Sequence, residues 1–187
     1  MGIELLLGWA AWSVMLSSHT GWAALRPEKI HVADERKNQA YIDDGLIIGG
    51  DRNVQATIKD IRRSNNEGFE RVVIDLDSTD PAENASIQRP PYYQIEVTPD
   101  EKRLVVTIWG QPKSDFNPKK VIAAFKRSAI MKDIVLLPRL EDPLWIFTFD
   151  LKSDVSVEAF ELSKPPRVIM DVKLRKKFAA TQSKNEG

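Results

Sequence analysis

The sequence predicts an all-β fold: a β-sandwich of two sheets, with about eight strands and one amphipathic helix. Three observations predict it. Short segments of alternating apolar and polar residues recur between turn-rich loops. A single stretch of helical periodicity, near residues 118–129, interrupts them. An arginine, an apolar run and an aspartate occur in the same order at residues 71–75 and 167–171, which is typical of a buried strand with charges at its ends.

The first two strands of this domain are expected to form a β-hairpin. Residues 54–63 and 70–77 flank a loop at 64–68 that is rich in Asn and Gly, residues that tolerate a positive φ. The second strand places Val72, Ile74 and Leu76 on one face. Residues 77–91 contain three prolines and show no periodicity, so they are expected to form a long polar loop.

A second hairpin is expected over residues 92–98 and 103–109. Both segments alternate, with Tyr93 and Ile108 among the inward residues, and Pro99 begins a turn between them. Two consecutive hairpins favour antiparallel sheets.

The expected helix begins at Pro118 and runs to about Ala129. Asn117 is a suitable N-cap, and proline is favoured at the first helical position. Apolar residues recur on one face while lysine and arginine occupy the rest, so the helix is expected to pack on the sheets.

Four further strands are expected after the helix, at residues 132–137, 144–151, 155–162 and 167–174. In the third, the apolar phase changes between Val157 and Phe160, which predicts a β-bulge. Pro165 and Pro166 confine the start of the last strand to an edge or a terminal position.

The N-terminus has the pattern of a secretory signal peptide. Residues 3–16 contain no Lys or Arg and are mostly apolar, and Gly21 and Ala23 follow in the spacing that a signal peptidase accepts. We expect cleavage after Ala23, which removes residues 1–23 and leaves a periplasmic protein with no stable membrane span. An uncleaved anchor is the alternative, although about 14 apolar residues fall short of the roughly 20 that span a bilayer.

The rest of the chain is expected to divide into three parts. Residues 24–53 are mixed and charged, and they are expected to form either a linker with at most one strand, around 46–48, or a disordered stalk. The sandwich domain is expected over residues 54–175, followed by a disordered polar tail at 176–187.

Composition excludes several classes of function. Basic and acidic residues number 27 each, so binding to nucleic acid through bulk charge is not expected. The chain has no cysteine, which excludes disulfides and a thiol nucleophile. Its two histidines, His19 and His31, lie in the expected signal and linker, so the folded domain is expected to hold no His-based catalysis or metal site. We therefore expect no enzyme, no metal and no cofactor.

Carboxylates remain as candidates for catalysis. Asp75, Asp77, Asp80, Glu141 and Asp142 could supply a glycosidase pair or a calcium site. Each lies at a strand end or in a loop, where solvated acids are common, and none matches the spacing of a calcium loop. A glycan hydrolase that uses Asp75, Asp77 or Glu141 is the alternative function.

The two Arg-apolar-Asp segments admit two interpretations. Arg71 and Arg167 either mark equivalent ligand sites or belong to charged strand ends whose arginines and aspartates pair across strands. Such pairs contribute little when they are exposed. The second interpretation is favoured.

Two aromatic residues suggest a binding surface. Tyr92 and Trp109 are expected on the outward faces of their strands, close to Arg89, Gln94 and Arg103. Aromatic faces stack on the C–H surface of sugars, and guanidinium and amide groups supply directional hydrogen bonds. These five residues are the predicted ligand site, for sugar or peptide.

The chain resembles the AMIN domain of bacterial envelope proteins, found in periplasmic N-acetylmuramoyl-L-alanine amidases and in type IV pilus secretins. The resemblance covers residues 54–174 and rests on RVVIDL at 71–76, YQIEV at 93–97, RLVVTI at 103–108, FEL at 160–162 and PPRVIMDV at 165–172. It implies a two-sheet β-sandwich that localises its partners by binding peptidoglycan or envelope assemblies, and it supplies no catalytic residues.

Together these observations lead us to expect an exported, non-catalytic envelope module. It would bind peptidoglycan or an envelope or pilus complex and would localise or scaffold partners. The alternatives are the glycan hydrolase and a strand-adding assembly partner of a secretion or pilus machine, which would need an uncovered sheet edge.

Overall fold

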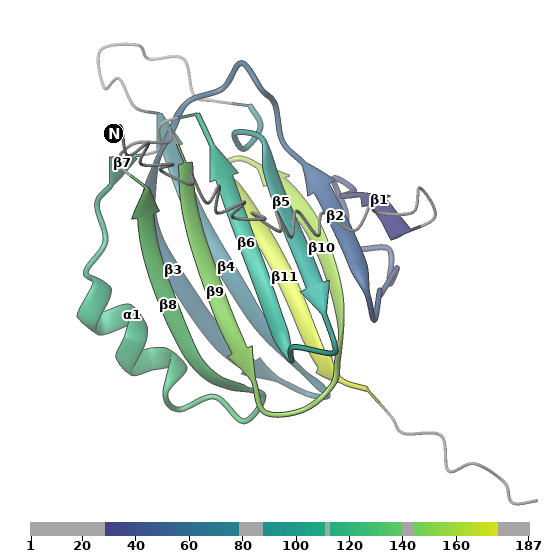
Figure 1. Ribbon diagram of the computed structural model, residues 1–187. Helices are drawn as coiled ribbons and strands as arrows, with labels where there is room; N and C mark the ends of the chain where they lie inside the picture. Colours follow the sequence, from purple (N-terminus) through teal and green to yellow (C-terminus); the bar gives the residue numbers. More distant parts are fainter. Residues whose placement is uncertain (1–28, 79–87, 111–112, 140–143, 176–187) are drawn as a thin grey trace, which may run out of the picture.

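The computed structural model describes residues 29–78, 88–110, 113–139 and 144–175, and it confirms the all-β sandwich of two sheets (Figure 1). The expected signal peptide, the tail at 176–187 and Glu141 lie outside the described residues. Eleven strands and one short helix make up this part of the chain, against about eight strands expected.

One sheet has six strands in the order β1-β2-β5-β6-β9-β8, and the other has five in the order β10-β11-β4-β3-β7. The six-stranded sheet consists of β1 (Ile30–Val32), β2 (Gly45–Gly49), β5 (Tyr93–Thr98), β6 (Arg103–Trp109), β8 (Met131–Arg139) and β9 (Leu144–Leu151). The five-stranded sheet consists of β3 (Ala56–Asn66), β4 (Phe69–Ser78), β7 (Lys113–Ser114), β10 (Val155–Ser163) and β11 (Pro166–Leu174).

The core lies between the two sheets and is built by strand alternation. On β4, Val72, Ile74 and Leu76 are buried, as their period of two predicts. On β11, Val168, Met170 and Val172 are buried in the same core. The two strands are direct antiparallel neighbours although about 95 residues separate them along the chain. The segments with the repeated Arg-apolar-Asp pattern are therefore equivalent central strands of one sheet.

Residues 24–53 contribute more than the single strand considered for them. Within this segment, β1 and β2 pair in parallel, and β2 continues the sheet by pairing with β5. His31 belongs to β1, so the described domain does contain a histidine, contrary to expectation. A three-residue strand such as β1 is too short to produce a recognisable alternation in the sequence.

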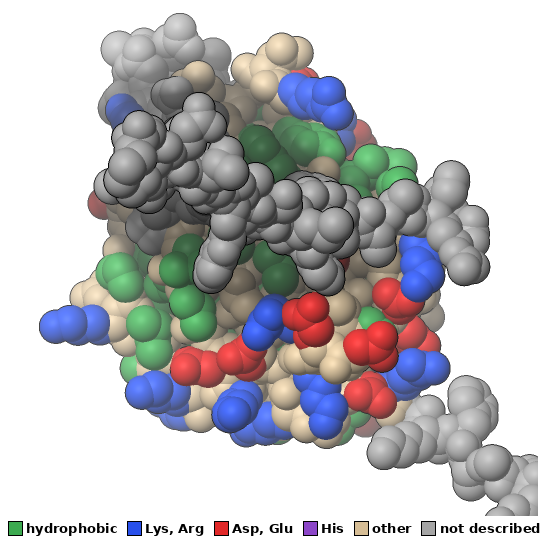
Figure 2. Space-filling view, in the orientation of Figure 1, with side chains coloured by type: hydrophobic (Ala, Val, Ile, Leu, Met, Phe, Trp, Pro, Cys, Tyr) green, Lys and Arg blue, Asp and Glu red, His purple; other side chains and the backbone are tan. Residues whose placement is uncertain are grey.

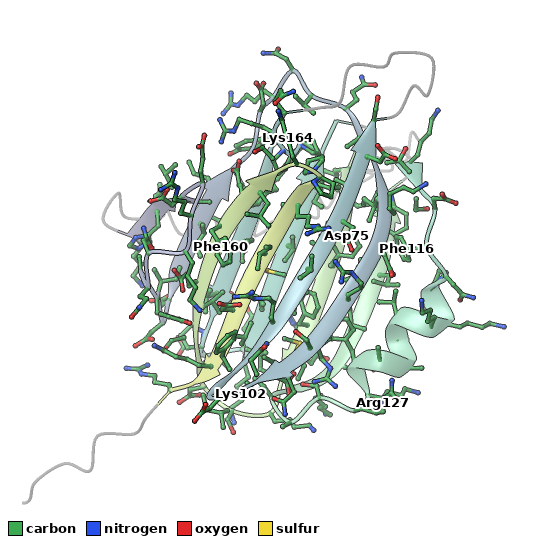
Figure 3. All side chains as sticks on the ribbon, turned by 180° about the vertical axis from the view of Figure 1, so that it is seen from behind. Asp75, Lys102, Phe116, Arg127, Phe160 and Lys164 are labelled. Carbon is green, nitrogen blue, oxygen red and sulfur yellow. The ribbon has the colours of Figure 1, made fainter. Side chains whose placement is uncertain are left out.

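The β-bulge expected in the strand at 155–162 is absent. The register between β10 and β11 is continuous from Val155 to Ser163. The apolar phase changes because both faces of β10 are buried: Val157 faces the core, whereas Phe160 lies on the outer face, beside the chain segment 33–42. Figure 3 shows Phe160 on that outer face. Bulges occur instead in β3, between Ile58 and Asp60, and in β8, between Met131 and Asp133.

The helix α1 (Pro118–Phe125) is shorter than the expected 118–129 but starts as predicted. The Asn117 side chain accepts hydrogen bonds from two backbone N–H groups of the first turn. The helix stops because Glu70 holds the next residues in another conformation, accepting from the Ser128 hydroxyl and the Ala129 N–H, both at 2.6 Å. α1 closes one side of the sandwich beside β3 and β8 (Figure 1). In the described part of the chain, no helix has the length and apolar character needed to cross a membrane.

Candidate binding pocket

A pocket of about 430 Å³ opens on the outer face of the six-stranded sheet, where β5 begins and β6 ends. Its volume lies in the range of small-ligand sites. Three of its lining residues belong to these strands or adjoin them, and the others come from the loop before β3 and the turn after β6. The described lining residues are Arg52, Val54, Tyr92, Gln94, Trp109 and Gly110.

Two aromatic rings form the walls of the pocket. The ring centroids of Tyr92 and Trp109 are 5.2 Å apart, and the ring planes make an angle of 47°. The Trp109 N–H donates to the Tyr92 carbonyl oxygen at 3.0 Å, so the backbone holds the two residues side by side. Both side chains are half-buried, which leaves aromatic surface open to a ligand.

Two polar side chains are placed around the Tyr92 ring. The Gln94 amide donates to the Tyr92 hydroxyl at 2.8 Å. The guanidinium of Arg52 lies over the ring, 5.0 Å from its centroid, which is a cation–π contact. The pocket therefore offers two ring faces, an amide and a cation to whatever enters it.

The loop that carries Arg52 is held by backbone hydrogen bonds. The Asp51 N–H donates to the Pro90 carbonyl at 2.9 Å, and the Tyr92 N–H donates to the Asp51 carbonyl at 2.8 Å. Gly50 begins this loop with a φ of +78°, and a Cβ there would lie 2.1 Å from the Pro91 carbonyl oxygen. Only glycine fits this position, because it combines a left-handed backbone with a close approach of two chain segments.

A buried carboxylate beneath the pocket ties this loop to the other sheet. Glu161 of β10 is 3% exposed and accepts from the Gly50 N–H at 2.6 Å and from the Tyr93 hydroxyl at 3.3 Å. Arg89 pairs with the same carboxylate at 3.1 Å. Burial, and then the nearby negative charge of Glu161, raise the pKa of Tyr93 well above its usual value, so its hydroxyl remains a hydrogen-bond donor.

The structure brings together three of the five predicted ligand residues: Tyr92, Gln94 and Trp109 all line the pocket. Arg89 and Arg103 do not belong to its described lining. Arg89 is instead the partner of Glu161.

Arg103 lies at the opposite end of β6 from Trp109. There it pairs with Glu101 at 2.8 Å and Asp150 at 3.4 Å. Charged side chains gather on the lower part of this face of the molecule (Figure 2). The sequence predicts these two arginines from their closeness to the aromatic residues, but Arg89 pairs with Glu161 of β10, and Arg103 pairs with Glu101 of the adjoining turn and with Asp150 of β9.

Sequence reasoning missed Arg52, Val54 and Gly110. The sequence feature that could have indicated Arg52 and Val54 is the glycine pair at 49–50. A turn at these glycines allows the residues that follow to pass over the start of β5. A φ of +91° at Gly110 similarly turns the chain after β6, where an added Cβ would lie 2.9 Å from the Val54 carbonyl oxygen.

The described lining of the pocket holds no carboxylate. Of the acids considered for a hydrolase, Asp75 accepts from Arg62 and from Arg167 on the outer face of the five-stranded sheet (Figure 3). Within the described residues, no group of three or more His, Asp or Glu side chains is arranged to hold a metal ion.

Comparisons with protein-family models and with curated proteins find no match for this chain.

Proposed function

We propose that this protein is an exported, non-catalytic module of the bacterial cell envelope that binds peptidoglycan through the Tyr92–Trp109 pocket and localises partners there. The observation that carries the proposal is the pair of tilted aromatic rings, 5.2 Å apart, in an open pocket with an amide and a guanidinium beside them. This is the composition of a site for a ring-shaped, partly polar ligand.

Sugars fit such a site for a physical reason. The axial C–H groups of a pyranose make an apolar face that stacks on an aromatic ring, while its hydroxyl and acetamido groups need directional partners. Gln94 keeps its carbonyl oxygen as an acceptor, because its amide nitrogen is the group that donates to Tyr92. Arg52 adds several N–H donors at the edge of the same ring.

Two properties of the sequence support an envelope location. The apolar N-terminal segment has the pattern of a signal peptide. The resemblance to AMIN domains, carried by the strand motifs at 71–76 and 165–172, implies the same compartment and the same class of ligand. An envelope or pilus protein complex is the other partner that this resemblance implies.

The strand-adding alternative has less support, because the described strands β3, β8 and β10 each carry a feature that blunts or covers their free edge. Next to the bulge in β3, the Asp60 carboxylate accepts from the Ile61 N–H at 2.9 Å. Asp133 does the same for Ile134 at 2.8 Å, beside the bulge in β8. At the edge of β10, the segment 33–42 runs alongside and pairs with it through a bridge from Ile42 to Val157.

A pull-down with purified peptidoglycan sacculi tests the proposal. We expect the sacculi to retain the wild-type protein and to lose most of the Trp109→Ala variant, because the stacking surface is gone. Leu174→Ala, a change at an exposed residue of β11, is the matched control and should be retained like the wild type. If sacculi retain no more wild-type protein than an unrelated periplasmic protein, wall binding is wrong and a protein partner becomes the better interpretation.

A further inference from the structure

We propose that the pocket selects a sugar that carries a carboxylate, and that Arg52 is the residue that pairs with this carboxylate. The inference rests on the proposed function, since it names the class of sugar that the same pocket prefers. It is argued from the charge of the pocket, the position of the guanidinium and the way its loop is held.

The charge of the pocket is the first argument. Among the described residues of the lining, Arg52 is the one charged side chain. No ion pair forms between Arg52 and any acid of the described chain, and its guanidinium lies over the Tyr92 ring. By contrast, Arg62, Arg71 and Arg89 each pair with a carboxylate. A guanidinium that has no acidic partner among the described residues, and that lies beside a half-buried aromatic pocket, is complementary to an anionic ligand.

The position of the guanidinium is the second argument. It lies 5.0 Å from the centroid of Tyr92, and that ring lies 5.2 Å from Trp109. A pyranose stacked on either ring is therefore within reach of Arg52. The planar fork of an arginine matches the two oxygens of a carboxylate, and such two-point pairs are stronger than contacts to neutral hydroxyl groups.

The support of the loop is the third argument. Arg52 follows Asp51, whose N–H and carbonyl both bond to the segment 90–92. One oxygen of the Asp51 carboxylate, Oδ1, accepts from the Asn53 N–H at 2.8 Å, which fixes the turn that carries Arg52. Glu161 holds Gly50 from below. The backbone that presents Arg52 is thus fixed before a ligand arrives, which lowers the entropic cost of binding.

Matched pairs of sugars test the inference. N-acetylmuramic acid differs from N-acetylglucosamine by a lactyl group that carries the carboxylate, and glucuronic acid differs from glucose by the oxidation of one carbon. Each sugar is titrated into the purified protein at low ionic strength, and the indole N–H of Trp109 is followed by NMR to obtain Kd. The first pair tests a muramyl sugar whose lactyl carboxylate is free, as in wall glycan that carries no stem peptide, and the second pair tests a uronate, so the two pairs separate the possible sources of the carboxylate.

We expect the acidic member of at least one pair to bind about tenfold more tightly than the neutral member. In Arg52→Gln the ratio of the Kd values for the neutral and acidic sugars should fall to about 1, because a glutamine amide can still donate to hydroxyl groups but cannot form the two-point ion pair with a carboxylate. Arg127→Gln, which removes an exposed arginine near the end of α1 (Figure 3), is the control and should keep the preference.

Two different results would be negative, and they are distinguishable. Equal binding of acidic and neutral sugars by the wild type, or a preference that survives Arg52→Gln, would overturn the inference and leave the proposed function intact. If no sugar perturbs the Trp109 signal, both the inference and the sugar-binding function of this pocket are wrong.

Discussion

Arg71 and Asp171 form a two-point ion pair between the neighbouring strands β4 and β11, with N–O distances of 2.7 and 2.8 Å. The reverse pair joins Arg167 to Asp75 at 2.8 Å. The arginine of each Arg-apolar-Asp segment thus pairs with the aspartate of the other segment. The antiparallel register places Arg71 opposite Asp171 and Arg167 opposite Asp75. The cross-strand pairing that the sequence favoured is present.

The two ion pairs differ in burial. We therefore expect the removal of each arginine to lower the free energy of unfolding by a different amount. Asp171 is fully buried, whereas Asp75 is 19% exposed and keeps Arg62 as a second partner. Arg71→Ala should lower the free energy of unfolding by about 2 kcal/mol, because a buried carboxylate is left with Lys37 alone. Arg167→Ala should cost less than about 1 kcal/mol. Urea denaturation measures both, and equal costs would contradict this assignment.

We expect substitutions at buried residues of the central strands β4 and β11 to cause the largest losses of stability. Ile74 and Met170 are fully buried on β4 and β11. Truncating either to Ala should cost about 2 to 5 kcal/mol, through lost burial and a cavity. Leu174→Ala, at a half-exposed position of β11, should change stability by less than about 0.5 kcal/mol. A small effect of Ile74→Ala in the same denaturation assay would show that the two sheets do not pack as described.

Two buried acids predict a loss of stability at low pH. Burial alone would raise the pKa of Glu70, but hydrogen bonds from Ser128 and Ala129 and the charge of Arg63 outweigh it and lower the pKa. Burial likewise opposes ionisation of Asp171, and its bonds to Arg71 and Lys37 lower the pKa overall. Their stabilisation is therefore present above the pKa of the unfolded chain and is lost as the pH falls through the folded values.

We expect the free energy of unfolding to fall between about pH 5 and about pH 2. Glu70→Gln should make this decrease smaller, because one of the two responsible acids no longer titrates. A pH profile of the variant that matches the wild type would exclude Glu70 as a contributor. Asp77→Asn, which removes an exposed carboxylate from the same strand, is the matched control.

The backbone conformation of Gly50, two residues before Arg52, is expected to affect both stability and ligand binding. Gly50 and Gly68 both have a positive φ, but a Cβ at Gly68 would meet no atom within 4 Å, whereas one at Gly50 would overlap the Pro91 carbonyl. Gly68→Ala should cost about 1 to 2 kcal/mol through its backbone conformation alone. Gly50→Ala should cost more and should also weaken retention by sacculi. Equal stabilities of the two variants would contradict the close approach that holds the pocket loop.

Local patterns were sufficient to predict most of the sandwich and part of the pocket. Alternation along 92–98 and 103–109 correctly placed Tyr93 and Ile108 in the core and Tyr92 and Trp109 on the outer face. The contact between the two aromatic rings follows from the hairpin register, which pairs Tyr93 with Ile108. A tight turn between the strands restricts this register to few choices.

Other features depended on contacts between residues far apart in the chain. The apolar pattern of β10 changes phase because the segment 33–42 covers the outer face of this strand, so that apolar residues lie on both faces. From the sequence alone, such a strand looks the same as a strand with a bulge. Helix α1 ends early because Glu70 of β4, which lies 58 residues before Ser128 in the chain, accepts hydrogen bonds from Ser128 and Ala129 in the turn that follows the helix.

The sequence by itself determined which residues face the core, where the hairpins turn and which aromatic residues face outward, because these depend on the period of a strand and on local φ preferences. Tertiary structure decided which arginine near the aromatic residues pairs with a buried acid and which one lines the pocket. Arg89 forms an ion pair with Glu161 of β10. Arg52 lies over the Tyr92 ring and has no acidic partner in the described chain. The acid that pairs with a given arginine depends on how the two sheets are placed against each other. The packing of the whole core, and not any short segment, determines this placement.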